Sequence, residues 1–429
     1  MLNRLDLRGV ADPRPLLPRP DTGGEGPVDV VRGIVDDVRA NGDEALRRLT
    51  AEFDGVDLAD VRVSAETCAA ALAGLDADLR RALEVAAANV EAFHQSQVRS
   101  AHDWEREGVR VRGRIVPVAR AGCYVPGGRA AYPSTVLMTA IPARVAGVDE
   151  IVLCVPPDRT TGDVAPVTLA AAAIAGVDEV YAVGGAQAIA AMAYGTESVA
   201  PVDVICGPGN LYVAIAKRVV SDHVGIAAAF AGPSEIVVVA DGTTPPDCAA
   251  VDVMVQAEHG PDGMAWLITW SEEVADVIDA RIDTLVADAP RRDEITRTLQ
   301  SNGWVALVDG PAEAVALSNL IAPEHLQLMC EGADTLAESV TSAGAVFCGP
   351  LAPASIGDYV AGPSHVLPTH GSARFGSALT VDDFTKQVHV ITLDDAAFRR
   401  LGPVVESIAT AEGLDAHAQS IRVRRDSTP

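Results

Sequence analysis

The spacing of hydrophobic and polar residues changes part-way along the chain. Residues 30–54 and 70–97 carry apolar side chains at three- and four-residue spacing. This spacing gathers the apolar side chains on one face of a helix, so we predict amphipathic helices there. From about Ile115 onward, short β-branched runs such as EIVLCV and SEIVVVAD alternate with alanine-rich helical segments. This alternation is typical of parallel strands joined by crossover helices and predicts an α/β fold.

One strand-and-helix unit is repeated within this region. The stretch AGVDEIVLCV begins at Ala146 and recurs as AGVDEVYAVG from Ala175, 29 residues later. This period matches one strand with its crossover helix. Downstream we predict a helix over 272–286 and a strand over 303–310, then a loop-rich stretch to about Gly376. The last fifty residues carry a helix signal around VVESIATAEGLDAHAQSI.

Composition limits the class of protein. A chain of 429 residues with 48% hydrophobic residues can bury a large core and usually divides into two or more domains. No signal-peptide core is visible, and the longest apolar stretches fall short of the roughly 18 residues that a membrane span requires, so we predict a cytoplasmic location. A net charge of -26 argues against nucleic acid or an anionic membrane as a partner. The seven cysteines are scattered, which argues against a disulfide framework or a cysteine zinc site.

Three predicted strands end in glycine-rich turns, at CYVPGG (123–128), VGGAQA (183–188) and CGPGNLY (206–212). In open parallel sheets, ligands bind beyond the carboxyl ends of the strands, where small residues let phosphates approach backbone amides. None of the three is a G-x-G-x-x-G fingerprint, and each alone is consistent with ordinary turn chemistry. Because they follow one another along the same predicted sheet, they favour a nucleotide site.

The stretch VQAEHGPDG (255–263) places metal-capable side chains where a helix is expected to end. Gln256 and His259 are three residues apart, so both would lie on one helical face and could share a metal, while Glu258 points elsewhere. A polar helix end with hydrogen-bonded side chains is the alternative. The pair therefore requires further ligands from elsewhere in the chain.

Pairs of acid and histidine occur downstream. In APEHLQL, Pro323 is a helix-start signal, so we predict Glu324 and His325 in the exposed first turn of a helix, where the pair could hold and move protons. The alternative is a helix-start carboxylate beside a bystander histidine. Two further pairs lie in a Gly/Pro loop and near the C-terminus, where solvated side chains are the alternative to a site: Asp358 with His365, and Glu412 with His417.

Five stretches together resemble a known family. In chain order they are GPSEIVVVAD, VQAEHGPDG, APEHLQL, GDYVAGPSHVLPTHGSARF and EGLDAHAQSI, spread over some 190 residues. They are similar to histidinol dehydrogenase, and the similarity extends over essentially the whole chain. The resemblance implies a zinc-dependent homodimer that oxidises L-histidinol through L-histidinaldehyde to L-histidine with two NAD, the last steps of histidine biosynthesis.

The resemblance also implies the fold class: two incomplete Rossmann-like parallel-sheet domains, with small N- and C-terminal segments that pack on the dimer partner. The expected division is an N-terminal segment (1–21), a first Rossmann-like domain (22–122 and 234–379), a second, NAD-binding one (123–233) and a dimer-swapped C-terminal segment (380–429).

Residue roles follow from the matched motifs. The resemblance implies zinc ligands at Gln256, His259, Asp358 and His417, the last supplied with Glu412 by the neighbouring subunit. It implies His325 as the base that takes the hydroxyl proton and Glu324 as the group that activates water at the aldehyde stage. Two further sets are implied. Substrate contacts fall on the four zinc ligands and on Ser234, His325, His365 and Glu412, and NAD contacts fall on Tyr124, Gln187 and Asn210.

One position departs from the family, which usually has Asn where Ser364 precedes His365. Ser is also small and polar, so we expect it to hold the loop. A related zinc and NAD dehydrogenase of another small alcohol, such as a sulfonated propanediol, is the alternative function, and His365 and Glu412 favour histidinol. A cofactor-free zinc hydrolase would leave the three glycine turns unexplained, and a non-catalytic scaffold would show no activity that depends on Glu324 or His325.

Overall fold

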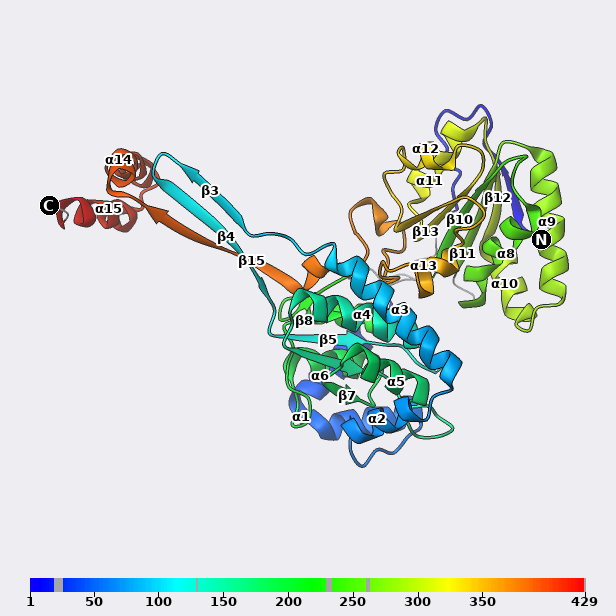
Figure 1. The fold of residues 1–429 in the computed structure, drawn as a ribbon, viewed down its shortest axis with the longest axis horizontal. Coiled ribbons are helices and arrows are strands. Elements are labelled where there is room, and N and C mark those ends of the chain that lie inside the picture. The colour runs from blue at the N-terminus through cyan, green and yellow to red at the C-terminus, as the bar shows by residue number, and fades with distance from the viewer. Residues whose placement is uncertain (19–25, 129, 229–233, 260–262, 428–429) are drawn as a thin grey trace. The chain divides into compact units, whose positions relative to one another are not determined.

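The computed structural model describes residues 1–18, 26–128, 130–228, 234–259 and 263–427, without the side chains of His259 and Ser427. The chain forms two compact units (Figure 1). The larger unit comprises residues 1–97 and 118–384, and the smaller one comprises residues 98–117 and 385–429. In the larger unit, two sheets each carry helices on both faces, which is the α/β architecture that the alternating pattern predicts.

The first sheet is wholly parallel, in the order β1-β12-β11-β10-β13-β14. Its strands are β1 (Asn3–Asp6), β10 (Glu235–Ala240), β11 (Met264–Thr269), β12 (Gly303–Leu307), β13 (His325–Met329) and β14 (Ala345–Cys348). Helices α8 (Pro246–Val255), α9 (Glu272–Ala287) and α10 (Arg292–Asn302) bury apolar side chains against one face. Helices α11 (Pro311–Ile321) and α12 (Ala333–Ala337) do so against the other face.

The second sheet has the order β2-β7-β6-β5-β8-β9 and is parallel except for the β2–β7 pair. Its strands are β2 (Arg62–Val63), β5 (Arg120–Tyr124), β6 (Glu150–Cys154), β7 (Glu179–Tyr181), β8 (Val204–Cys206) and β9 (Gly225–Ile226). One face packs on α2 (Ala65–Ala73), α3 (Ala77–Gln95), α4 (Pro133–Ala146) and α5 (Pro166–Ala175). The other face packs on α1 (Val28–Asp54), α6 (Gly185–Tyr194) and α7 (Leu211–Val220). The repeated unit is confirmed, since its two copies form the adjacent parallel strands β6 and β7.

The packing differs from the expected domain division within residues 1–122, where residues 98–117 belong to the smaller unit and not to the first Rossmann-like domain. Residues 28–95 form α1 to α3, which cover the second sheet, although the division groups them with residues 234–379. Strand β1 belongs to the first sheet, although residues 1–21 are expected as a separate segment. The apolar face of an amphipathic helix can pack on either sheet, so the spacing of apolar residues does not show which sheet the helix covers.

The smaller unit is an antiparallel sheet with two helices. Strand β4 (Val109–Pro117) lies between β3 (His102–Arg106) and β15 (Thr385–Leu393). Helix α14 (Asp395–Ala411) is followed by α15 (Asp415–Ser427). The predicted terminal helix is therefore two helices, and the chain turns between them at Gly413, whose φ of 72° suits glycine.

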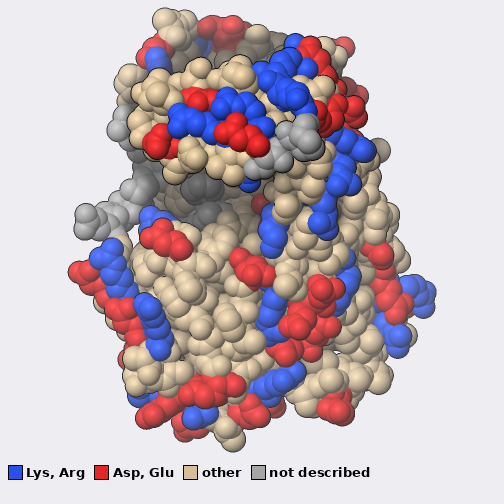
Figure 2. Space-filling view, turned by 90° about the vertical axis from the view of Figure 1, so that its left-hand side faces the viewer, with Lys and Arg blue, Asp and Glu red and all other residues tan. Residues whose placement is uncertain are grey.

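The surface displayed in Figure 2 mixes both signs of charge, with arginine and lysine side chains interspersed among aspartate and glutamate. Across the described ranges, the helices are each too short or too polar to cross a membrane.

Candidate active site

Glu324 and His325 stand at the start of a buried strand. Their exposed fractions are only 9% and 3%. The predicted helix start is therefore wrong: α11 ends before this point, Ala322 adopts a left-handed conformation with φ 54°, and Pro323 leads into β13. Pairing of β13 with β10 and β14 outweighs the local helix-start signal, because strand pairing is a tertiary interaction that the local sequence does not encode.

The backbone of Glu235 holds both side chains. His325 Nδ1 lies 3.1 Å from the Glu235 carbonyl oxygen, and a carbonyl only accepts, so Nδ1–H donates. The Glu235 N–H donates to Glu324 Oε2 over 3.0 Å. Glu324 Oε2 lies 3.5 Å from His325 Nδ1. Hydrogen bonds to the Glu235 backbone, at the start of β10, thus hold the Glu324 carboxylate and the His325 imidazole side by side.

The other ring nitrogen of His325 faces a second carboxylate. Nε2 lies 3.1 Å from Asp358 Oδ1 on α13 (Ala354–Tyr359). Burial lowers the pKa of His325, but the charge of Glu324 and the bond to Asp358 outweigh it and raise that pKa to about 10. A cation bound to Asp358 would compete for this carboxylate and bring the pKa of His325 back toward neutral values.

His365 lies next to this pair in the fold. Its Nδ1 is 2.8 Å from the Asp358 carbonyl oxygen, and its Nε2 is 3.0 Å from Thr135 Oγ1 on α4. Burial lowers the pKa of His365, which favours the neutral ring. Ser364 donates from Oγ to the Met138 carbonyl oxygen over 2.9 Å, and the same Oγ accepts the Val366 N–H over 3.2 Å. Ser364 therefore holds the loop as expected.

The predicted metal ligands are distributed over the chain. Gln256 follows α8 and begins the 3₁₀ turn η1 (Gln256–His259). The His259 side chain lies outside the described part. Among the described residues, no group of three or more His, Cys, Asp and Glu side chains is gathered to hold a metal ion. His417 and Glu412 belong to the smaller unit, where both are exposed.

The donor chemistry of Gln256 and Asp358 nevertheless fits zinc. Gln256 is 2% exposed and begins η1, so its amide oxygen is held away from bulk water at the position where a ligand is expected. Oxygen and imidazole nitrogen donors without a thiolate suit this borderline metal. Ser234 lies half-buried just before β10.

The three glycine turns lie at one edge of the second sheet, because β5, β7 and β8 run parallel and all end there. Tyr124 is buried at the end of β5, and its hydroxyl accepts the Gly185 N–H over 3.1 Å. Asn210 caps α7 by accepting the Val213 N–H over 3.1 Å. Gln187 is 1% exposed, and its Oε1 has no hydrogen-bond partner among the described residues. This oxygen is therefore available to accept a hydrogen bond from a ligand.

Lys217, which the sequence analysis missed, supports this edge. It is fully buried in α7 and donates from Nζ to the Gly207 carbonyl oxygen. Gly207 has a φ of 103°, and a Cβ there would lie 2.0 Å from the Tyr124 carbonyl oxygen, so only glycine fits. A lone lysine in the apolar run LYVAIAKRVV was the available sequence signal.

Lys217 should make the free energy of unfolding depend on pH. Burial lowers its pKa from 10.5 to about 8. Between these values the unfolded chain binds more protons than the folded chain, so the free energy of unfolding should rise with pH. We expect the free energy of unfolding of the wild type, relative to that of Lys217→Met, to increase by about 2 kcal/mol from pH 8 to pH 9.5. Urea titrations at both pH values measure this difference. Lys386→Met, at an exposed lysine, is the control, and equal slopes for the wild type and Lys217→Met would contradict the assignment.

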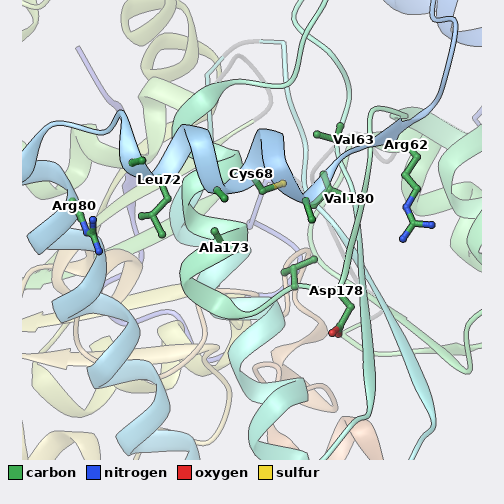
Figure 3. A pocket seen from close by; sticks show the side chains of 12 residues that line it. Arg62, Val63, Cys68, Leu72, Arg80, Ala173, Asp178 and Val180 are labelled. Carbon is green, nitrogen blue, oxygen red and sulfur yellow. The ribbon is translucent and has the colours of Figure 1, made fainter.

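A surface pocket elsewhere is a weaker candidate site. This pocket has a volume of about 340 Å³ and lies between α2 and α5, with Arg62 and Arg80 at opposite ends (Figure 3). Its charged side chains already have partners: Arg62 contacts Glu179 at 3.2 Å and Arg80 contacts Glu84 at 2.8 Å. It contains none of the predicted site residues.

A buried acid–base pair on one parallel sheet and a glycine-rich strand end of the nucleotide-binding type on another define an α/β enzyme that moves protons. The family model described as histidinol dehydrogenase matches residues 18–425. The chain belongs to the histidinol dehydrogenase family, which confirms the resemblance carried by the five stretches.

Individual relatives agree with this assignment. The histidinol dehydrogenase of Gluconobacter oxydans is 47% identical over 402 residues, with 92% of each chain covered. That of Bacillus subtilis is 42% identical, with 94% of each chain covered. A crystal structure of histidinol dehydrogenase from Elizabethkingia anophelis superposes with a TM-score of 0.94 at 36% identity, covering 99% of this chain and 98% of that one. The predicted α/β fold class with parallel sheets is thereby confirmed.

Proposed function

We propose that this chain oxidises L-histidinol, through L-histidinaldehyde, to L-histidine with two NAD, as the last steps of histidine biosynthesis. The observation that carries the proposal is the buried Glu324–His325 pair, held by the Glu235 backbone, in a chain of this family. Enzymes of the family use Zn²⁺ and NAD and act as homodimers. The curated relatives named above are all histidinol dehydrogenases, so oxidation of a sulfonated propanediol is not favoured.

The acid–base work falls to two side chains. His325 takes the hydroxyl proton of histidinol on Nε2, the nitrogen that faces Asp358, and serves again as the base at the aldehyde stage. Glu324 takes a proton from the water whose oxygen adds to the aldehyde carbon. Burial of the pair limits access of bulk water and so protects the aldehyde from side reactions. When bound, NAD would supply the hydride acceptor for each stage, and zinc would supply a positive charge that helps to orient the substrate.

Other residues bind and orient. Gln256, His259, Asp358 and His417 would hold zinc, and through it the substrate. Ser234, His365 and Glu412 would contact histidinol directly, and Tyr124, Gln187 and Asn210 would contact NAD. Glu412 and His417 are exposed on the smaller unit, which suits donation to the site of the partner subunit. The active site would then be shared between subunits, with residues 380–429 as the swapped segment, residues 123–233 as the NAD-binding domain and the cytoplasm as the location.

Zinc removal tests the metal assignment. We expect a chelator to abolish NADH formation from histidinol and added zinc to restore it. Gln256→Leu should weaken zinc binding by more than about 100-fold, since even groups that only orient a ligand contribute about 10- to 100-fold.

Gln187→Leu is the matched control, because it removes another fully buried glutamine. It should retain zinc and instead raise the KM for NAD. Zinc content by atomic emission and NAD titration separate the two variants. Equal zinc affinity in Gln256→Leu and the wild type would exclude Gln256 as a ligand.

A further inference from the structure

Glu235 has a carboxyl group that the mechanism above does not use. It is the first residue of β10, next to β13, in the register that pairs Ile236 with His325. Glu235 and Glu324 therefore stand opposite each other on neighbouring strands. Strand alternation places both side chains on the sheet face of Val237 and Leu326, and neighbouring strands lie about 5 Å apart. Two acidic side chains are thus held side by side.

The surroundings of Glu235 disfavour two charges. Glu235 is 5% exposed, and its Oε2 has no hydrogen-bond partner within the described ranges. The groups that act on its carboxyl are Glu324 and His325 from β13 and the backbone N–H of His370, and β11 places Met264 opposite it. Burial, followed by the charge of Glu324, raises the pKa of Glu235 to about 8. Adjacent buried carboxyls titrate as a pair because one charge opposes the other.

We propose that Glu235 is a positioning residue that tunes Glu324 as a base, through two buried carboxyls held side by side on β10 and at the start of β13. This rests on the proposed role of Glu324 at the aldehyde stage. While Glu235 is protonated, Glu324 has a neutral neighbour. Once Glu235 has lost its proton, the second charge makes Glu324 a stronger acceptor for the proton of water. The aldehyde stage should therefore gain rate as pH rises through about 8.

The test compares pH profiles of the two stages in the zinc-loaded full chain. Histidinaldehyde with NAD reports the second oxidation, and single-turnover release of the first NADH from histidinol reports the first. In Glu235→Gln we expect the step near pH 8 to vanish from the second oxidation. Its rate should fall about 10-fold at pH 9 and stay within about threefold at pH 6.5. The first oxidation should change less than the second at both pH values, because there the Glu235 carboxyl acts only through its charge on His325.

Glu235→Asp separates tuning from a packing role. It keeps an ionisable group on the same backbone position, so the step should persist with a shifted midpoint. A step retained in Glu235→Gln, or equal losses at both stages in both variants, would overturn the proposal. If Glu324→Gln oxidised the aldehyde normally, the proposed role of Glu324 would fail instead, and that result is independent of the Glu235 variants.

Discussion

Replacing His325 with asparagine should lower kcat for both oxidations by about 100- to 10,000-fold, the usual contribution of a general base. The imidazole has Nδ1 tied to the Glu235 carbonyl and Nε2 directed at Asp358, so one nitrogen orients the ring and the other exchanges the proton. Asparagine can keep one of these bonds but cannot take a proton at neutral pH. Initial rates of NADH formation with saturating zinc and NAD measure the loss.

His94→Asn is the matched control for this substitution. His94 is also fully buried, and its Nδ1 lies 2.8 Å from the Val90 carbonyl oxygen, but it lies in α3 and has no carboxylate hydrogen-bonded to its ring among the described residues. We expect it to lose stability and retain kcat in the protein that remains folded. A His325→Asn variant with kcat similar to that of His94→Asn would contradict the role of His325 as base.

Glu324→Gln should separate the two oxidations. The amide cannot accept a proton, so the water that adds to the aldehyde is not activated, and the second oxidation should slow by about 100- to 10,000-fold. The first oxidation does not require this proton transfer and should remain within about tenfold of the wild type. Histidinol would then yield one NADH and accumulate aldehyde, which an aldehyde-trapping reagent detects.

The control for this variant is Glu331→Gln. Glu331 follows the carboxyl end of β13 and is exposed, so it probes the same strand away from the site. It should form two NADH per histidinol at the wild-type rate. If Glu324→Gln also formed two NADH at an undiminished rate, the water-activating group would be another residue.

Local patterns predicted the elements well where each element depends on its own residues. The helical spacing of residues 30–54 corresponds to α1, and the repeat corresponds to β6 and β7. The three glycine turns meet at one sheet edge, because parallel strands place all their carboxyl ends together. The chemistry of Glu324 and His325 was visible in sequence, although the strand that carries them was not.

Pairings over long distances in sequence could not be predicted. Strand β15 joins β4 across more than 250 residues, and its residues alone indicate neither partner nor direction. Glu235 was assigned to a strand from SEIVVVAD, but its position beside Glu324 depends on the β10–β13 register. The predicted zinc ligands come from three separate stretches of the chain, and no single stretch indicates that they would share a metal ion.

The most direct test of the central claim is the ratio of NADH formed to histidinol consumed, measured by absorbance at 340 nm together with chromatography of the products. We expect two NADH and one L-histidine per L-histidinol, with both lost after chelation. One NADH with aldehyde as the end product, or no turnover of histidinol with intact zinc and NAD, would contradict the proposed four-electron oxidation.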